Sequence, residues 1–304
     1  MNGKTLEKKL KEYYMDNKFS KSWINMRIQY DLKSRSDLLI QYLKKNYSNY
    51  DMELLDMCCG SGSFLIWSIK NKILFSKCTL LDYDMKLLKS IKSNLRKNLP
   101  KSFIIKSNSN NMNLILKKDN LISSSIIIKK NDCNKFNGKT KKFHVISYSA
   151  VLDFMSKSSI IKSLKKCNDN NAIFFSLCFN GKVRWTPTNT FDKYILSFFN
   201  KHQRTDKGFG TALGSKSIEF VKRTANLLDI NVTTKNSPWL IYNKSDRDKI
   251  FLHRYLLDIK KALFHIEGID KDILRKWYQD KKYDIENKSI KLSVGHQDIL
   301  LFKK

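Results

Sequence analysis

The sequence predicts an α/β fold built on an open, mostly parallel sheet, and three stretches support this prediction. Residues 53–66 read as a buried strand, a turn of small residues with two glycines, and the start of an apolar helix. Residues 78–84 read as a second strand that ends in carboxylates, Asp82 and Asp84. Residues 172–178 are almost continuously apolar, which is typical of a strand covered on both faces. In such sheets a ligand binds where the first strand meets the glycine turn.

The composition indicates a globular protein with a strongly basic surface. The chain has 304 residues, of which 41% are hydrophobic, enough for one large α/β domain. The formal net charge is +30, but only nine of the 58 basic residues are arginine, and the lysines are spread over nearly every polar segment. Nucleic-acid readers favour arginine and concentrate their charge. We therefore expect a solvated basic surface, with nucleic acid as a possible partner that is not favoured.

Other sequence features bear on location and metal binding. The N-terminus is polar and lacks the apolar core of a signal peptide, and no apolar run is long enough to span a membrane. The six cysteines have no metal-ligand spacing, and disulfide frameworks belong mostly to small secreted domains. We expect a cytoplasmic protein with no metal and no membrane partner, and the oligomeric state stays open.

Two helical stretches precede the first strand. Residues 4–17 carry an amphipathic pattern, and a second helix is expected from about Ser22 to Lys45. Within it Trp23, Arg27, Asp31 and Arg35 recur every four residues and so share one face. This face is either a surface ladder of ion pairs or a polar wall over a ligand pocket.

The rest of the chain continues the α/β pattern. After the second strand we expect a helix at 85–99, and further strands at 126–130, 143–149 and 172–178. Beyond residue 180 the expected elements are a turn-rich segment at 181–187, a helix at 192–200, a polar loop at 201–210, a helix at 215–228, a sixth strand at 231–242, a helical insert at about 245–285 and a last strand at 289–302.

The strand, the Asp56-Met-Cys-Cys-Gly-Ser-Gly turn, the helix and Asp82 about twenty residues later together resemble the class I, Rossmann-like S-adenosylmethionine-dependent methyltransferases. The resemblance covers roughly residues 50–180, and the chain also resembles an uncharacterised bacterial subgroup. It implies a seven-stranded, mostly parallel sheet with an antiparallel last strand. It also implies one domain over 1–304, with N-terminal helices at 1–48, a cofactor half at 50–180 and an acceptor half at 181–304 that holds the insert.

The resemblance implies S-adenosyl-L-methionine as cofactor and assigns its contacts. Asp82 would hold the ribose hydroxyls, Asp132 the adenine amino group, and the two glycines would pass beneath the methionine part. The full set of expected cofactor residues is Asp56, Cys58, Gly60, Gly62, Asp82, Tyr83, Asp132, Cys133 and Ser149. Cys58 stands where the family usually has a glycine, and we expect its φ to stay negative. His144 begins the fourth strand where an acidic residue is common.

The acceptor residues are harder to find from sequence. A general base assists methyl transfer to a hydroxyl or a protonated amine, and histidine is the usual one. We expect His202, in the loop at 201–210, or His296, which shares a strand face with Asp298. For both, an ordinary structural histidine is the alternative. The expected acceptor-binding residues are Trp23, Arg27, Arg184, Trp185, Arg204 and Asp206.

These residues predict a methyltransferase (EC 2.1.1) that acts on an oxygen or nitrogen atom of a small molecule. An RNA or protein methyltransferase and a non-catalytic cofactor-binding protein are alternatives. A dinucleotide oxidoreductase fits less well, because Cys58 and Ser63 interrupt its G-x-G-x-x-G fingerprint.

Overall fold

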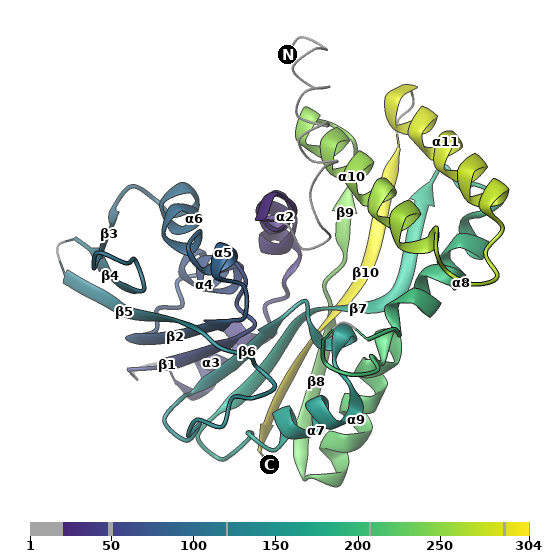
Figure 1. Cartoon of the computed structure of the whole chain (residues 1–304). Helices are drawn as coiled ribbons and strands as arrows, with labels where there is room; N and C mark the ends of the chain where they lie inside the picture. Colours follow the sequence, from purple (N-terminus) through teal and green to yellow (C-terminus); the bar gives the residue numbers. More distant parts are fainter. Residues whose placement is uncertain (1–20, 48–50, 120, 207, 288–289, 304) are drawn as a thin grey trace.

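A mixed sheet forms the centre of the molecule (Figure 1). The computed structural model describes residues 21–47, 51–119, 121–206, 208–287 and 290–303, so the helix expected at 4–17 lies outside the described residues. Within them the sheet has ten strands in the order β3-β4-β5-β2-β1-β6-β7-β10-β8, and β9 pairs with β10 beside this row. The strands are β1 (Glu53–Met57), β2 (Lys77–Asp82), β3 (Phe103–Ser107), β4 (Asn113–Lys118), β5 (Leu121–Lys130), β6 (Val145–Ser149), β7 (Ala172–Thr186), β8 (Ile230–Asn236), β9 (Trp239–Ile241) and β10 (Lys291–Lys303).

Strand directions match the expected plan, and the strand count exceeds it. Neighbouring strands from β5 through β2, β1 and β6 to β7 are parallel. The last strand, β10, is antiparallel to both β7 and β8, between which it lies. The seven expected strands are therefore present, the sixth of them in two pieces, β8 and β9, and β3 and β4 are additional. The alternation that marks β4 is hidden in the sequence, because Ile115 on its exposed face is as apolar as the buried Leu114 and Leu116.

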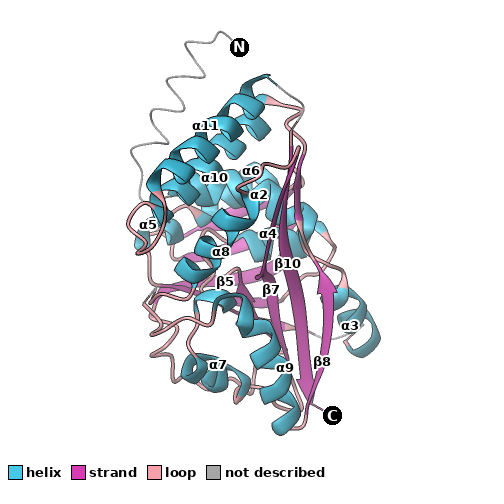
Figure 2. Ribbon diagram, turned by 90° about the vertical axis from the view of Figure 1, so that its right-hand side faces the viewer, coloured by secondary structure: helices cyan, strands magenta, loops and turns pink. Residues whose placement is uncertain are grey.

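Helices cover both faces of the sheet, and the alternation along β10 shows which helix covers which face. Leu300 packs in one cluster with α3 (Leu38–Asn46), α4 (Ser63–Lys70) and α6 (Ile91–Asn98). Its neighbours Ile299 and Leu301 pack in another with α7 (Lys157–Leu164) and α9 (Ser217–Leu227). Figure 2 shows α3 and α9 on opposite sides of β8 and β10.

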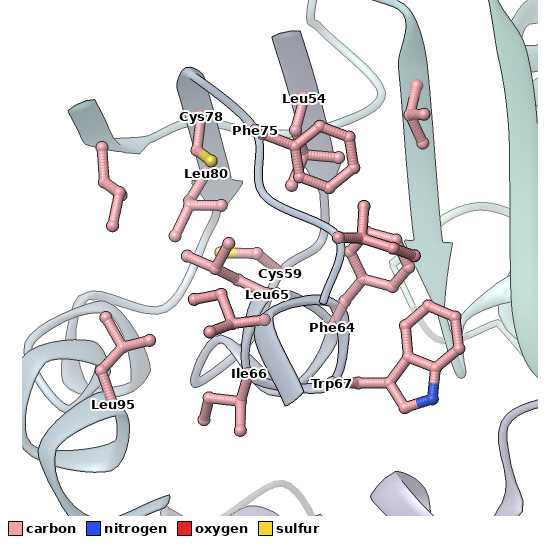
Figure 3. Packing of buried hydrophobic residues seen from close by; sticks show 14 of the residues in the cluster. Leu54, Cys59, Phe64, Leu65, Ile66, Trp67, Phe75, Cys78, Leu80 and Leu95 are labelled. Atoms are coloured by element: carbon pink, nitrogen blue, oxygen red, sulfur yellow. The ribbon is translucent and has the colours of Figure 1, made fainter. Parts of the chain in front are cut away.

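The helix after the glycine turn is buried on all sides. Every residue of α4 from Ser63 to Ile69 is buried, because the helix packs in one cluster with residues of β1, β2 and α6 and is also in contact with α2 (Lys21–Ser34). Figure 3 shows Phe64, Leu65 and Trp67 of α4 in this cluster. A helix that is apolar all round can pack only in the interior. The turn that precedes it is thereby held on a rigid base.

A third cluster of apolar residues lies beyond the carboxyl ends of the central strands. It joins α2, α8 (Asp192–Gln203), α10 (Asp246–Leu263) and α11 (Lys271–Asn287) to β9 and to the first residues of β10. Figure 1 shows α2, α10 and α11 around the upper parts of β7, β9 and β10. The expected insert is thus a pair of helices that builds a layer over one end of the sheet.

Several expected elements differ in detail. The helix expected at 85–99 is divided into α5 (Met85–Leu88) and α6. The helix expected at 22–45 is interrupted at Arg35–Asp37, where α2 ends and α3 begins. The sixth strand is broken at Ser237 and Pro238 into β8 and β9. The prediction of a turn-rich segment at 181–187 is wrong, because β7 continues through Gly181 to Thr186 in pairing with β10. A register shift opposite Gly181, whose φ is +84°, accommodates the glycine within the strand.

Candidate active site

Three alternate residues of the turn after β1 have a left-handed backbone. Cys58, Gly60 and Gly62 have φ values of 57°, 55° and 84°. The expectation of a negative φ at Cys58 is therefore wrong. Its backbone N–H donates to the Sγ atom of Cys133 at 3.0 Å, and this bond helps hold the residue in a conformation that glycine adopts more readily.

Asp82 ties the glycine turn to the end of β2. Its Oδ2 accepts from the backbone N–H of Gly60 at 2.8 Å, and its Oδ1 accepts from that of Asp84 at 2.9 Å. Burial raises the pKa of this carboxyl, while the two backbone bonds act in the other direction. The side chain is therefore held in one orientation beside the turn.

A cavity of about 710 Å³ opens at these strand ends. Its volume lies in the range of sites that hold a cofactor or a drug-sized ligand. A Cβ added to Gly60 would have no heavy atom within 4 Å, so the backbone there faces open space. Seven of the nine expected cofactor residues line this cavity, namely Cys58, Gly60, Asp82, Tyr83, Asp132, Cys133 and Ser149.

The other two expected cofactor residues support the turn from inside. Asp56 is fully buried, and its Oδ1 accepts from the hydroxyl of Ser147 at 2.5 Å. Burial raises the pKa of Asp56 to about 7, although the bond from Ser147 and the charge of Arg35 lower it. A Cβ on Gly62 would lie 3.3 Å from Ile91 of α6, so this glycine allows close packing between the turn and that helix.

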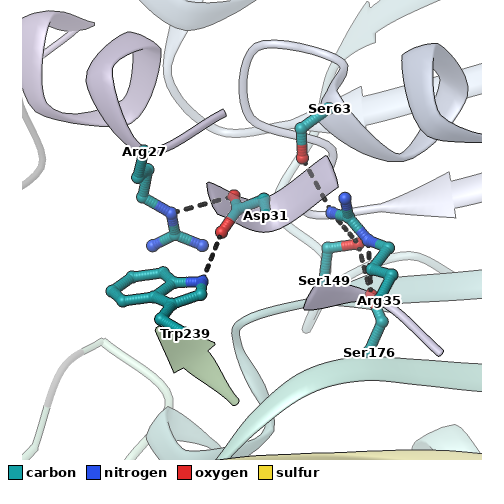
Figure 4. Close-up of polar contacts among 7 residues, drawn as sticks. All are labelled: Arg27, Asp31, Arg35, Ser63, Ser149, Ser176 and Trp239. Carbon is teal, nitrogen blue, oxygen red and sulfur yellow. Dashed lines mark hydrogen bonds and ion pairs between the residues drawn. The ribbon is translucent and has the colours of Figure 1, made fainter. Parts of the chain in front are cut away.

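Arg27 and Asp31 of α2 line this cavity, and Figure 4 shows their polar contacts together with those of Arg35 in the loop after α2. Arg27 donates from Nε to Asp31 at 3.1 Å, and the indole N–H of Trp239 donates to the other oxygen of Asp31, also at 3.1 Å. Arg35 is buried and donates to the hydroxyls of three serines, of which Ser63 and Ser149 line the cavity and Ser176 lies behind. The face shared by Arg27, Asp31 and Arg35 is thus an internal wall and not a surface ladder.

A smaller cavity of about 120 Å³ adjoins the large one. Arg27, Ala150 and Phe154 line both. Its remaining walls are largely aromatic and come from α2, β7, β9 and the helices above the sheet. The aromatic lining residues are Trp23, Phe154, Phe179, Phe199, Trp239 and Tyr255, and the polar ones are Arg27, Asp153, Gln203, Asp258 and His296.

His296 is one of two expected general bases, and it lines the smaller cavity. Its ring lies 4.7 Å from that of Trp239 and 6.2 Å from that of Phe179, between centroids. Burial lowers the pKa of His296 to about 3, the charge of Arg27 lowers it further, and the backbone of Val294 acts in the other direction. The imidazole is therefore neutral at physiological pH. Its Nδ1 is buried and has no hydrogen-bond partner among the described residues.

Asp298 lies on the same face of β10 as His296, but its hydrogen bonds stabilise the fold. Its oxygens accept from the backbone N–H of Leu177 and the hydroxyl of Ser237, and from both the N–H and the hydroxyl of Ser36, at 2.7 to 2.8 Å. These bonds join β7, the link between α2 and α3, and the link between β8 and β9. No bond between Asp298 and His296 occurs in the described part of the chain.

Comparisons with known proteins bear on the fold. No protein-family model matches the chain, and no curated protein matches it. Among solved structures, the YcgJ protein from Bacillus subtilis superposes with a TM-score of 0.50 and 11% identity, over 88% of this chain and 97% of that one. A putative methyltransferase from Bacillus halodurans gives a TM-score of 0.47 and 12% identity over the same shares. The chain shares the Rossmann-like α/β fold of the YcgJ structure, a mostly parallel sheet with an antiparallel last strand. The fold expected from the sequence is confirmed.

Five of the expected acceptor-side residues lie outside both cavities. Because β7 continues past Gly181, Arg184 is exposed and Trp185 packs in the core against Trp277. His202 is in the last turn of α8, and its neighbour Gln203 is the residue that lines the smaller cavity. Arg204 is exposed, and Asp206 accepts from the backbone N–H groups of Gly208 and Gly210. The roles proposed for these five residues stay predictions.

The structure adds residues that sequence reasoning missed. Trp239, Gln203 and Tyr255 line the smaller cavity, and Phe154 lies between the two cavities. In sequence Trp239 and Tyr255 look like ordinary apolar residues of a strand and a helix. One signal was present in the sequence. The polar residues expected on one face of α2 need hydrogen-bond partners, and Trp239 is the partner of Asp31.

The described residues include neither a metal-binding cluster nor a membrane-spanning helix. Within the described ranges, no group of three or more His, Cys, Asp or Glu side chains is arranged to hold a metal ion. None of the helices in that part of the chain has the length and apolarity needed to cross a bilayer.

Proposed function

We propose that the protein is an S-adenosylmethionine-dependent methyltransferase that methylates an oxygen or nitrogen atom of a small molecule. The observation that carries this proposal is the pair of adjoining cavities. A methyl donor and an acceptor need two separate sites that meet at one point, so that the reacting atoms are held in line. The large and small cavities meet at Arg27, Ala150 and Phe154.

The large cavity fits the proposed cofactor. Its volume suits a nucleoside joined to an amino acid, and the open space over Gly60 leaves room for a ligand against the backbone. In this proposal Asp82 accepts from the ribose hydroxyls, Tyr83 and Asp132 lie at the adenine, Cys133 lies beside it, and Gly60 and Ser149 lie along the methionine part. Asp56 and Gly62 support the turn from below.

The acceptor in this proposal lies in the smaller cavity, between Trp23 and His296. The bound cofactor supplies a methyl group on a positively charged sulfur, so the protein has mainly to align the acceptor and exclude water. His296 is neutral, and its Nδ1, which has no partner among the described residues, can accept a hydrogen bond from the acceptor during the transfer. Its lowered pKa makes it a weak base for a full proton. Asp298 takes no part in this transfer, because its oxygens hold the backbone and serines around it. His202, Arg184, Trp185, Arg204 and Asp206 have no role in this version of the site.

Calorimetry with S-adenosylhomocysteine tests the proposed function. We expect the wild-type protein to bind it, and Asp82→Asn to bind about tenfold more weakly or worse, because an amide is a poorer acceptor for two hydroxyls than a carboxylate. Asp169→Asn, an exposed aspartate outside both cavities, is the matched control and should bind as the wild type does. Thermal unfolding of each variant checks that it is folded. Absence of binding by the wild type, or preferential binding of NAD⁺, would contradict the proposal.

A further inference from the structure

We propose that the acceptor is a small molecule with one ring-sized apolar part and a carboxylate, which Arg27 binds where the two cavities meet. This inference rests on the proposed function and names the substrate class of the same site. Its support comes from the shape of the smaller cavity, the arrangement of Arg27, and the state of the other charged groups on the walls.

The smaller cavity has the size and lining of a site for one ring. Its volume of about 120 Å³ is close to that of apolar cavities of about 150 Å³, which hold a benzene molecule. Trp23, Phe179, Phe199, Trp239 and Tyr255 present aromatic surfaces to it. Such surfaces bind a flat apolar group by stacking or edge contact. A long or bulky acceptor would not fit without rearrangement of these side chains.

Arg27 is held in a fixed orientation with its two terminal nitrogens available. Its Nε is bonded to Asp31, and its Cζ lies 5.3 Å from the centre of the Trp239 ring (Figure 4). Neither terminal nitrogen donates to another described residue. Two parallel N–H groups on a planar guanidinium match the two oxygens of a carboxylate. Because Asp31 and Trp239 already orient the group, little side-chain freedom is lost when an anion binds.

Each of the acidic residues around Arg27 already has an interaction within the protein. Asp31 accepts from Arg27 on one oxygen and from Trp239 on the other. Asp258 accepts from Arg254 at 2.9 Å, and Asp153 also has an interaction of its own. Among the described residues that line the smaller cavity, Arg27 is the cationic side chain, and its two terminal nitrogens are left for a ligand of opposite charge. A carboxylate on the acceptor satisfies it and places the ring among the aromatic residues.

The carboxylate has a second possible source, the amino-acid end of the cofactor, since Arg27 lines the large cavity as well. We favour the acceptor because Trp23, one helical turn before Arg27, faces only the smaller cavity. Methylthioadenosine separates the two sources, because it lacks the amino-acid end of S-adenosylhomocysteine.

The test measures the binding of benzoate, benzyl alcohol and benzylamine to the whole protein by calorimetry, with and without S-adenosylhomocysteine. We expect benzoate to bind about tenfold more tightly than either other probe, as a charge-assisted bidentate contact allows. In Arg27→Gln the preference for benzoate should disappear. In Arg223→Gln, which removes an exposed charge outside both cavities, it should persist. Arg27→Lys keeps the charge without the fork and should retain only part of the preference.

Three results would overturn the inference. Equal binding of the three probes to the wild type would do so without any variant, and so would tighter binding of benzylamine. A loss of affinity for S-adenosylhomocysteine but not for methylthioadenosine in Arg27→Gln would assign Arg27 to the cofactor. Failure of the wild type to bind S-adenosylhomocysteine contradicts the proposed function instead, and benzoate binding to the unloaded protein still tests the cavity.

Discussion

Three non-glycine residues with positive φ surround the two cavities. Cys58, Ala150 and Leu177 have φ values of 57°, 53° and 57°; the first two directly follow β1 and β6, and Leu177 lies within β7. Each N–H is bonded, to the Sγ of Cys133, the carbonyl of Ser176 and the carboxylate of Asp298. Such a conformation costs about 1 to 2 kcal/mol at a residue with a Cβ. The polar groups around the site therefore hold the backbone in a strained shape, which is common where ligands bind.

The effect of one buried polar group, the carboxyl of Asp56, can be tested through the pH dependence of stability. Its pKa of about 7 lies above that of the unfolded chain, so the folded protein keeps a proton that the unfolded chain releases. Its contribution to stability is present below pH 4 and is lost as the pH rises to about 7. We expect Asp56→Asn to gain free energy of unfolding relative to wild type over this range, by at most about 4 kcal/mol.

Urea unfolding of both proteins at pH 4 to 8 measures this difference. Asp169→Asn controls for the chemical change at an exposed site. A difference between Asp56→Asn and wild type that stays constant with pH would show that Asp56 is ionised in the folded protein throughout.

At the scale of elements, β7 is the strand that runs from the proposed cofactor side of the sheet to the proposed acceptor side. Its first half is buried on both faces between β6 and β10, and its second half reaches Trp185 in the aromatic cluster. Gly181 divides the two halves. Its carbonyl accepts from the side chain of Asn200 on α8 at 3.0 Å. This bond helps β7 to position α8, whose residues Gln203 and Phe199 line the smaller cavity.

Gly181→Ala tests this element. A Cβ at Gly181 would lie 2.9 Å from the side chain of Ser215, and φ is +84°. Gly268 has a φ of +81° but only a contact at 4.0 Å, so Gly268→Ala carries the backbone cost without the clash. We expect Gly268→Ala to lose about 1 kcal/mol and Gly181→Ala to lose about 2 to 4 kcal/mol. Equal losses, measured by chemical denaturation, would show that β7 adjusts freely at this point.

At the scale of the whole molecule, one part of the fold departs from the expected plan. The chain between β5 and β6 contains no helix among its described residues, so one face of β3, β4 and β5 is uncovered and exposes Ile104, Ile115 and Ile127. Lys106, Lys117 and Lys129 each follow one of these isoleucines by two residues on the same strand. The basic charge therefore reaches the edge of the sheet farthest from the smaller cavity, which agrees with a charge spread over the surface.

Much of the cofactor side was predictable because its signals are local. A strand, a glycine turn and a carboxylate at the next strand end lie within thirty residues, and the physics of each acts over a few neighbours. The acceptor side was less predictable. His296 and Trp239 meet only because β10 is inserted beside β9, and Arg184 leaves the site only because β7 does not turn at Gly181. These placements depend on long-range strand pairing, which residue patterns do not reveal.

A crystal structure with S-adenosylhomocysteine bound tests the central claim, that the two adjoining cavities are the donor and acceptor sites. We expect the ligand in the larger cavity, with its ribose at Asp82 and its sulfur at the junction formed by Arg27, Ala150 and Phe154. The sulfur would then face the smaller cavity and His296. A ligand bound elsewhere, or one whose sulfur points away from this junction, would contradict the account.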